Sequence, residues 1–545
     1  LNTTGKLSPD DYCTHGPDGK ITVKEAPTTT LVRTIMTDDT GIAKTTPDLD
    51  LGLYLVVETK APDKVTAPAA PFLVSVPMTR IADNDTTNKL TDWIYDVHVY
   101  PKNATTYGQV TIEKKGYTGG GSEVALEGVK FKLEKNNGTD WTNITTNDSN
   151  SDPYDLTTDA NGKITIAGLS QGEYRIFEDA YSNTSANKGY ILDAEYHTFT
   201  VQKDGKIKVG KSDAVLNPNI EVANHRPDME KKVKKDGSWE HDAQYGVGDT
   251  VPYQITIDVP KNIAQLSTFT VTDTPTGLTD DENSIAVKKA DASGEPTGSD
   301  LTTIYTKAVN SNGFTITFTP SGMAAYAGEK LVITYNATVN NNAVVGGSGN
   351  LNKATLTYTN KIKSDSKPDT TTYTIEDSAV MYSFGIKVVK TAGDTSNALP
   401  NVVFDLYREA KAGETAVDPE TVKKAGLKDG KNWFLVKRGL TTDAQGIINT
   451  SDPDSANYIG GLAYGDYYLV ETKTAESYNL LTKPVKVELH VTANVQWNTN
   501  ETFDEHGKLT KRTVQTTTFT NSESGTSALT VANIVNRKGF TLPVT

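Results

Sequence analysis

The stretch GDYYLVETK, residues 465–473, decides the fold class of this chain. Tyr467 and Leu469 alternate with other side chains, and Glu471 lies in the same phase. This period-two alternation is typical of a half-buried β-strand. Two further stretches repeat the order Gly, Tyr, aliphatic residue and Glu, namely GEYRIFEDA at 172–180 and GLYLVVETK at 52–60. The repeat therefore predicts three related strands, each carrying a Glu: Glu58, Glu178 and Glu471.

The rest of the chain alternates in the same way, as in VPYQITIDV at 251–259 and KLVITYNATV at 330–339. Turn signals such as NNGTD, DANGK and SNGF separate these segments. The only helix that we expect is a short one within DPETVKKAGL, residues 418–427. Many short strands separated by turns predict an all-β protein built of β-sandwiches, and 545 residues are enough for three to five domains.

Composition excludes several classes of function. Lys and Arg number 54 against 68 Asp and Glu, a net charge of −14, and no long basic cluster occurs, so we expect no nucleic acid as a partner. No apolar run reaches the ~18 residues of a membrane span. The single Cys, Cys13, excludes an internal disulfide. The seven His show no metal-ligand or catalytic-triad spacing, so we expect no cofactor, no metal and no turnover enzyme.

Strands that end in Lys precede two of the repeats, and strands that end in Asn follow them. Lys114 in VTIEKK and Lys390 in IKVVK are in phase with the aliphatic residues of their strands, and so are Asn224 in IEVAN and Asn536 in ANIVN. These side chains are therefore expected to point into the core. A buried Lys costs several kcal/mol unless it is paired or neutral.

A buried Lys, Glu and Asn can react with one another. Burial lowers the pKa of a Lys and raises that of a Glu, which gives a nucleophilic amine and a proton donor. The donor polarises the Asn carboxamide and helps ammonia to leave, so a Lys–Asn amide forms without a cofactor. The alternative is a buried Lys–Glu ion pair with a hydrogen-bonded Asn, but two matched sets favour the amide.

Three motifs in order resemble those of Gram-positive sortase-assembled backbone pilins of the SpaA/FimA type. GDYYLVET resembles their E-box, VHVYPK at 97–102 their pilin motif, and LPVT at 542–545 the LPxTG sorting signal cleaved after its Thr. The resemblance covers the whole chain. It implies tandem immunoglobulin-like sandwiches of CnaB-like and CnaA-like type in an elongated rod, with internal isopeptide bonds promoted by the E-box Glu.

The region 227–383 has no E-box and resembles the CnaA-like sandwich, in which an Asp is the helper. The FTVTDT strand assigns that role to Asp273, and NKATLTY assigns the acceptor to Asn352. The Lys is Lys231 or Lys232, and we prefer Lys231. The resemblance thus implies three bonds: Lys114–Asn224, Lys231–Asn352 and Lys390–Asn536.

The first region departs from the pattern, because Glu58 has no convincing Lys strand before it. We expect that this domain lacks its opening strand, that any cross-link uses a Lys upstream of Leu1, and that Asn103 is the acceptor by position. The predicted domains are an incomplete N-terminal pilin domain (1–106), a CnaB-like domain (107–226), a CnaA-like domain (227–383) and a C-terminal CnaB-like domain with the sorting-signal tail (384–545).

The resemblance also implies how subunits join. A class C pilin sortase holds the carbonyl of Thr545, after Leu542, Pro543 and Val544, as a thioester, and Lys102 of the next subunit resolves it. The expected result is a covalent extracellular pilus attached to the cell wall, with tip and base minor pilins and host surface ligands as further partners. The alternative is a wall-anchored adhesin or tip pilin that binds host matrix or glycans.

Overall fold

The computed structural model describes residues 8–15, 21–24, 29–61, 65–81, 91–119, 121, 123–181, 189–193, 195–362, 371–448, 452–499, 501, 503–522, 525 and 527–539. Two compact units are present. The first consists of Leu1–Glu113, Lys130–Asp179 and Glu195–Val222, and the second of Lys114–Val129, Ala180–Ala194 and Ala223–Thr545. The predicted domain 107–226 contributes to both units, so the four-domain division stays a prediction.

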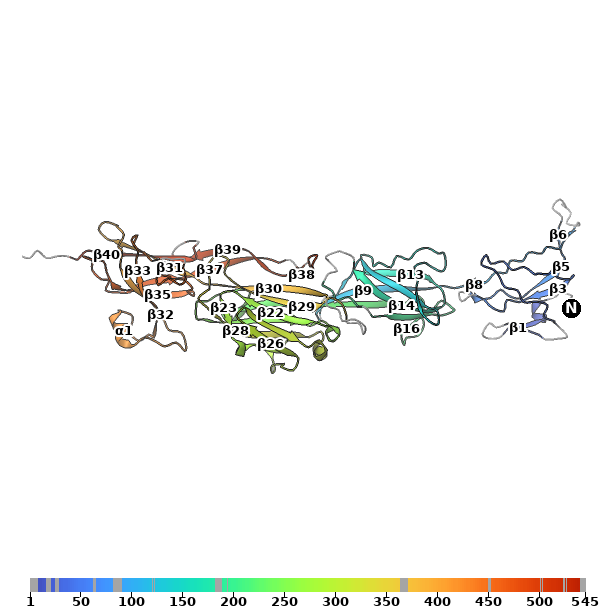
Figure 1. Cartoon of the computed structure of the whole chain (residues 1–545), viewed down its shortest axis with the longest axis horizontal. Helices are drawn as coiled ribbons and strands as arrows, with labels where there is room; N and C mark the ends of the chain where they lie inside the picture. Colours follow the sequence, from blue (N-terminus) through green and yellow to red (C-terminus); the bar gives the residue numbers. More distant parts are fainter. Residues whose placement is uncertain are drawn as a thin grey trace, which may run out of the picture. The chain divides into compact units, whose positions relative to one another are not determined.

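Strands dominate the described residues, which confirms the all-β prediction (Figure 1). The N-terminal part of the first unit holds four two-stranded pairings: β1 (Cys13–His15) with β2 (Ile21–Val23), β3 (Gly52–Val56) with β5 (Phe72–Val76), β4 (Val65–Ala67) with β8 (Ala104–Thr105), and β6 (Met78–Ile81) with β7 (Thr91–Ile94). A short 3-10 helix, η1 (Pro9–Asp11), precedes them.

Two sheets follow. In one, β9 (Gly108–Thr118) pairs with β10 (Glu123–Ala125), β13 (Lys163–Leu169) and β17 (Asn219–Arg226). The other has the order β12 (Trp141–Asn143), β11 (Val129–Asn136), β14 (Gly172–Tyr181), β15 (His197–Val201) and β16 (Ile207–Val209). Burial alternates strictly along β9 and places Lys114 on the same face as Val110 and Ile112, which confirms the predicted phase.

The middle region of the second unit is a sandwich of two sheets. The first has the order β19 (Ser238–Glu240), β18 (Asp228–Lys235), β21 (Thr250–Asp258), β28 (Lys330–Val339), β24 (Ala286–Ala290) and β25 (Pro296–Thr297), with β23 (Leu278–Asp280) also on β28. The second has the order β20 (Asp242–Gln244), β30 (Thr372–Tyr382), β29 (Asn350–Thr359), β22 (Phe269–Pro275), β27 (Gly313–Phe318) and β26 (Tyr305–Asn310). One apolar core joins their inner faces. Three 3-10 turns lie in the loops: η3 (Ile263–Gln265), η4 (Glu282–Ser284) and η5 (Pro320–Tyr326).

The C-terminal region has a second core between two smaller sheets. The first sheet has the order β34 (Ile447–Ile448), β31 (Gly385–Ala392) and β40 (Leu529–Asn536). The second has the order β33 (Trp433–Thr441), β32 (Val403–Glu409), β35 (Gly465–Lys473) and β36 (Val485–Leu489). The predicted short helix is α1 (Pro419–Lys424), and the Asp418 side chain caps it by accepting from the Thr421 N–H at 2.9 Å. Among the described residues no helix is long and apolar enough to cross a bilayer.

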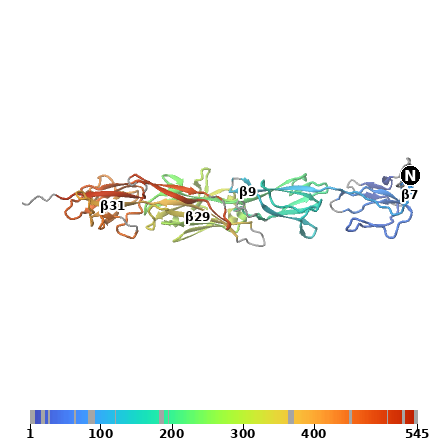
Figure 2. The same ribbon diagram turned by 90° about the horizontal axis from the view of Figure 1, so that it is seen from above.

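A long hairpin interrupts the C-terminal region. β37 (Val491–Asn498) pairs with β39 (Thr513–Asn521), and between them β38 (Lys508–Thr510) pairs with β30 of the middle region. We call residues 491–521 the arm. In Figures 1 and 2 its strands, coloured towards red, run from the C-terminal sheets alongside the yellow strands of the middle region.

Candidate functional site: buried lysine, acid and asparagine clusters

The first and last strands of the C-terminal region lie side by side and carry two of the predicted residues. β31 and β40 pair in parallel, with Lys390 opposite Ile534 and Ala392 opposite Asn536. Residues two apart on a strand share a face, so Lys390 and Asn536 point into the same core. They are 0% and 1% exposed. The two predicted residues are therefore enclosed in one core.

Glu471 reaches this pair from the opposite sheet. It lies on β35, is 4% exposed, and both carboxylate oxygens accept from Asn536 Nδ2, at 2.8 and 3.0 Å. The Leu481 backbone N–H fixes Glu471 by donating to Oε2 at 2.7 Å. Asn536 Nδ2 also lies 2.7 Å from Thr474 Oγ1. The nitrogen that would leave as ammonia is thus held against a carboxyl group.

Lys390 is an amine in an environment that disfavours charge. Burial lowers its pKa to about 8, against the opposing influence of the Glu471 carboxylate. Within the described residues the one hydrogen bond of Nζ goes to the Ile534 carbonyl, at 3.4 Å. The neutral form of this amine, in the same core as a carboxamide that is hydrogen-bonded to a carboxyl group, is the nucleophile that attack on the carboxamide requires.

The middle region builds a second cluster from residues of three different strands and both sheets. Lys231 of β18, Asp273 of β22 and Asn352 of β29 are 0%, 1% and 0% exposed. Lys231 Nζ donates to Asp273 Oδ1, and it lies 2.6 Å from the Tyr335 hydroxyl. Tyr335 donates to the same Asp273 oxygen at 2.9 Å and accepts from Asn352 Nδ2 at 3.1 Å.

The phenol of Tyr335 therefore lies at the centre of the middle cluster and touches all three predicted side chains. Sequence reasoning missed it, because a Tyr on an alternating strand is usually a core residue. Its neighbour Tyr253 stacks on it with ring centroids 5.4 Å apart, and Lys231 Nζ lies 5.3 Å from each ring. These rings exclude water from the amine.

Burial shifts the two charged partners of this cluster in opposite directions. It lowers the pKa of Lys231, which the Asp273 charge opposes, and it raises the pKa of Asp273, which Lys231 opposes. Both shifts favour transfer of the proton from the amine to the carboxyl group, which leaves a neutral nucleophile beside a neutral acid.

Asp280 is a further carboxyl group of the middle cluster. Burial and the charge of Asp273 raise its pKa to about 7. Both of its carboxylate oxygens are enclosed and accept no hydrogen bond from the part of the chain that the structure describes. It lies on β23, opposite Ala337 and so two residues from Tyr335 along β28. The sequence gives no signal for it, since the surrounding TGLTDDEN reads as a turn.

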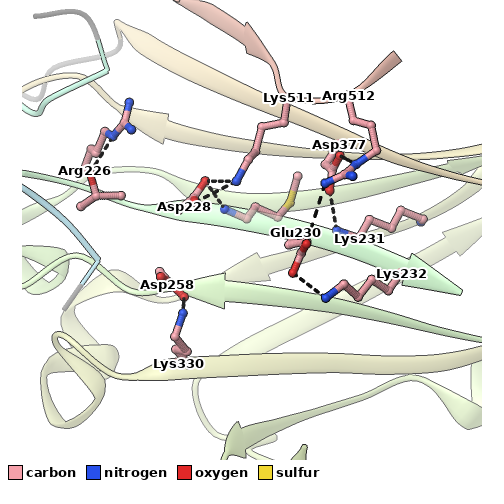
Figure 3. A network of polar contacts seen from close by, with 12 residues as sticks. Arg226, Asp228, Glu230, Lys231, Lys232, Asp258, Lys330, Asp377, Lys511 and Arg512 are labelled. Carbon is pink, nitrogen blue, oxygen red and sulfur yellow. Dashed lines mark hydrogen bonds and ion pairs between the residues drawn. The ribbon is translucent and has the colours of Figure 1, made fainter. Parts of the chain in front are cut away.

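The choice between the two adjacent lysines can be made from their environments. Lys231 is fully buried against Asp273, whereas Lys232 points to the outside and pairs with Glu230 at 3.0 Å. Figure 3 shows the Lys232–Glu230 pair on one side of β18. Successive residues of a strand face opposite sides of the sheet, so only one of the two can enter the core.

This geometry predicts different outcomes for two matched substitutions. Lys231→Ala should leave Asn352 unreacted, because the only amine inside the cluster is gone. Lys232→Ala should leave bond formation at Asn352 unchanged, because it removes only a partly exposed ion pair outside the cluster. Peptide mass mapping of both purified variants checks this. Cross-linked Asn352 in Lys231→Ala, or unreacted Asn352 in Lys232→Ala, would reverse the assignment.

The residues predicted for the second region are also buried. Lys114, Glu178 and Asn224 are 1%, 3% and 0% exposed. Lys114 and Asn224 both belong to the second unit, on the paired strands β9 and β17, whereas Glu178 lies on β14 in the first unit. In each strand the predicted residue is in phase with buried aliphatic side chains.

The first region contains an acid and an Asn that contact each other, and no Lys is among the described contacts of this pair. Asn103 Nδ2 donates to Glu58 Oε1 at 2.9 Å, and the Ala69 backbone N–H donates to Glu58 Oε2 at 3.0 Å and to Asn103 Oδ1 at 2.8 Å. Asn103 is exposed and Glu58 is half-buried. Lys102 is exposed, in a segment without regular structure between β7 and β8. The sorting signal 542–545 lies outside the described residues.

No group of three or more His, Cys, Asp and Glu suited to a metal ion occurs within the described ranges. The clusters instead share amine, carboxyl and carboxamide groups in a dry core. That combination suits acyl transfer from Asn to Lys, which needs no metal.

Three protein-family models match the chain in successive segments. Residues 12–104 match the Gram-positive pilin subunit D1, N-terminal domain. Residues 108–214 and 384–502 match a prealbumin-like fold domain, and residues 247–362 match the Gram-positive pilin backbone subunit 2, Cna-B-like domain. The last description differs from the CnaA-like type that we expected for the middle region from its helper Asp.

Individual proteins are similar over shorter stretches. The chain is 38% identical to the fimbrial subunit type 1 of Actinomyces viscosus over 96 residues, 17% of each protein. It is 24% identical to the trypsin-resistant surface T6 protein of Streptococcus pyogenes over 275 residues, 42% of this chain and 50% of that protein. The alignments thus span half or less of these relatives.

Solved structures of major pilins are also similar. The T6 backbone pilin of Streptococcus pyogenes is 18% identical, with a TM-score of 0.48, over 80% of this chain and 100% of its own. BcpA, the major pilin of Bacillus cereus, is 21% identical, with a TM-score of 0.45, over 79% and 99%. Models of Gram-positive pilin subunit domains thus match the N-terminal and middle segments of the chain, and a prealbumin-like fold model matches the segment that follows each of them.

Proposed function

We propose that this protein is the backbone subunit of a covalent pilus on the surface of a Gram-positive cell. Its internal strength comes from Lys–Asn amides, and its subunits are joined head to tail. The observation that carries the proposal is the enclosure of a Lys, an acid and an Asn together in the C-terminal and middle cores. A buried ion pair alone would not stabilise such a core, because the free energy of removing both charges from water exceeds that of their attraction.

The internal reaction is the same in each core. The neutral Lys Nζ attacks the Asn Cγ, and the acid gives its proton to the departing nitrogen and takes one from the attacking Nζ. The bond between Asn Cγ and Nδ2 breaks, ammonia leaves and the Lys–Asn amide forms. Glu471 acts on Lys390 and Asn536, Asp273 on Lys231 and Asn352, and Glu178 on Lys114 and Asn224. Each acid acts once on its own chain, so the protein is a structural subunit and not an enzyme.

The test of the internal bonds is the intact mass of the purified full chain, followed by mapping of tryptic peptides. We expect the mass to fall below the sequence mass by three molecules of ammonia, with one branched peptide for each Lys–Asn pair. A full-length chain at its unmodified sequence mass would overturn the proposal.

The external reaction joins copies. A pilin-specific sortase breaks the peptide bond on the carbonyl side of Thr545 in the precursor and forms a thioester with that carbonyl. Lys102 of a second copy attacks the thioester, which gives an intersubunit amide and releases the sortase thiol. A head-to-tail contact of this kind does not close on itself and therefore grows into a filament. Minor pilins would occupy its tip and base, and the base would be attached to the cell wall.

The shifted pKa of Lys390 predicts how the C-terminal bond depends on pH. The folded pKa, about 8, lies below the ordinary Lys value, so the reactive neutral form appears as the pH rises through 8. The rate of bond formation should rise about tenfold from pH 6 to pH 7 and level off above about pH 9. Unreacted chain from inclusion bodies, refolded at each pH and quenched in denaturant, gives this rate by peptide mass. A rate that is independent of pH from 6 to 8 would contradict the assigned nucleophile.

A further inference from the structure

The arm extends the middle region's sheet although it belongs in sequence to the C-terminal region. β38 pairs with β30 in parallel register, from Thr374 with Lys508 to Glu376 with Thr510. This strand addition satisfies backbone groups at that edge of the sheet. Strand β30 carries Asp377, which directly follows the last residue that pairs with β38.

Apolar side chains fix the arm in place. Leu509 and Phe503 are 1% and 2% exposed, and both belong to the core of the middle region. The Phe503 ring lies 5.6 Å from that of Tyr373. It packs so closely on Gly189, which has φ +89°, that a Cβ there would lie 2.1 Å from the ring. Burial of these two side chains makes the arm an integral part of the middle region rather than a loop resting on it.

Basic residues of the arm pair with acids around the strand that carries Lys231. Lys508 lies 2.8 Å from Glu376, Lys511 lies 2.8 Å from Asp228, and Arg512 Nε lies 3.2 Å from Asp377. Asp377 is fully buried, whereas the Asp228 carboxylate is 31% exposed. Figure 3 shows Lys511 and Arg512 side by side above β18.

Asp377 connects the arm to the nucleophile. Its Oδ2 accepts the backbone N–H of Lys231 at 2.8 Å, while its Oδ1 accepts from Arg512. The carboxylate therefore fixes the backbone of Lys231 from one side, and Arg512 is its compensating charge. Without Arg512 the core would hold an uncompensated carboxylate beside Lys231, which favours a charged, unreactive ammonium.

We infer that Arg512 is a positioning residue for the Lys231–Asn352 reaction, so that the middle-region amide forms efficiently only after the arm of the C-terminal region has docked. The inference rests on the proposed function. It makes the middle region depend on the C-terminal region in assembly: the C-terminal region supplies Arg512, without which the Lys231–Asn352 cross-link forms slowly. Arg512 does this through Asp377 and contacts neither Lys231 Nζ nor Asn352 in the described contacts.

The test follows both bonds in one refolding reaction of the full chain. Unreacted chain from inclusion bodies is refolded at constant pH, quenched at intervals and mapped by peptide mass. In Arg512→Ala we expect the Lys231–Asn352 bond to form at least about tenfold more slowly, because a buried charged hydrogen bond is lost. The Lys390–Asn536 bond in the same molecules should form at the wild-type rate, which shows that the C-terminal region has folded.

Two further variants separate positioning from general damage. Lys511→Ala removes the adjacent cation of the arm, and we expect both rates to stay within about twofold of wild type, because a partly exposed ion pair contributes little. The double variant Arg512→Ala with Asp377→Asn removes the uncompensated charge but keeps an acceptor for the Lys231 N–H, so the rate should recover.

The outcomes separate the inference from the function on which it rests. Equal Lys231–Asn352 rates in wild type and Arg512→Ala would overturn the inference and leave the pilin assignment intact. Failure of the double variant to recover would overturn the charge argument. A wild-type chain that loses no ammonia at any site would overturn the proposed function itself, and the inference with it.

Discussion

Replacement of Glu471 by Ala is expected to leave Lys390 and Asn536 unjoined and to lower the melting temperature of the C-terminal region by about 10–20 °C. The carboxyl group holds Asn536 Nδ2 through both oxygens and is the proton donor within reach of that nitrogen among the described side chains. Without it, ammonia has no acid to assist its departure. The intact mass should therefore fall below the variant's own sequence mass by one ammonia fewer than in the wild type.

The stability loss follows from the loop that the bond closes. Lys390 and Asn536 are separated by well over a hundred residues, and a cross-link over such a loop removes about 5 kcal/mol of unfolded-state entropy by analogy with disulfides. A change of this size shifts the melting temperature of a region of 150–250 residues by roughly 2–4 °C per kcal/mol. Calorimetry of wild type and variant measures the difference.

A matched control variant also removes one negative charge but leaves the Lys390, Glu471 and Asn536 cluster intact. Glu488→Ala removes a carboxylate of the adjacent strand β36 that pairs with Lys486 and is 42% exposed. It should keep all the amides and melt within a few degrees of wild type, since exposed ion pairs contribute little. If Glu471→Ala still shows the branched Lys390–Asn536 peptide, Glu471 is not the helper.

The alternation of apolar residues was sufficient to predict the strands and to predict which reactive side chains point into the core. Lys390 and Asn536 were placed inward by alternation alone, because the side-chain period of a strand is two and their aliphatic neighbours fix which face is buried. The same rule separated Lys231 from Lys232 only after the register of β18 was known.

Residues brought in from other strands could not be predicted in this way. Tyr335 and Asp280 reach the Lys231 cluster through strand order, which a single sequence does not reveal. The docking of the arm on the middle region was also not predicted, because β38 is three residues long and pairs with a strand more than a hundred residues earlier. Nothing local distinguishes Arg512 from a solvated surface Arg.

The pair of half-buried Glu58 and exposed Asn103 shows that the motif alone does not predict burial. Its hydrogen bond repeats that between Glu471 and Asn536, yet Asn103 is exposed, whereas Asn536 is 1% exposed. A Lys in water keeps its proton, so a bond at Asn103 would first require this pair to be covered, and the cross-link to a Lys upstream of Leu1 stays a prediction. The E-box motif thus identifies a strand, whereas the burial of the Lys and Asn side chains determines whether they can react.

Replacement of Lys102 by Ala is expected to abolish covalent polymers when the full-length precursor is expressed with its pilin sortase in a Gram-positive host. Lys102 is exposed and lies in an irregular segment, where Pro101 removes a backbone donor and prevents a regular strand, so an enzyme can reach its amine. The detergent-resistant ladders that wild-type protein forms should be absent from Lys102→Ala, which should stay a monomer.

Lys102→Arg should also fail to polymerise, because it keeps the charge but a guanidinium does not lose its proton to attack a thioester. Lys60→Ala, which removes another exposed Lys of the same region, should polymerise normally. Peptide mapping of wild-type ladders should give a Thr545–Lys102 branch, and ladders that persist in Lys102→Ala would show that a different Lys is the acceptor.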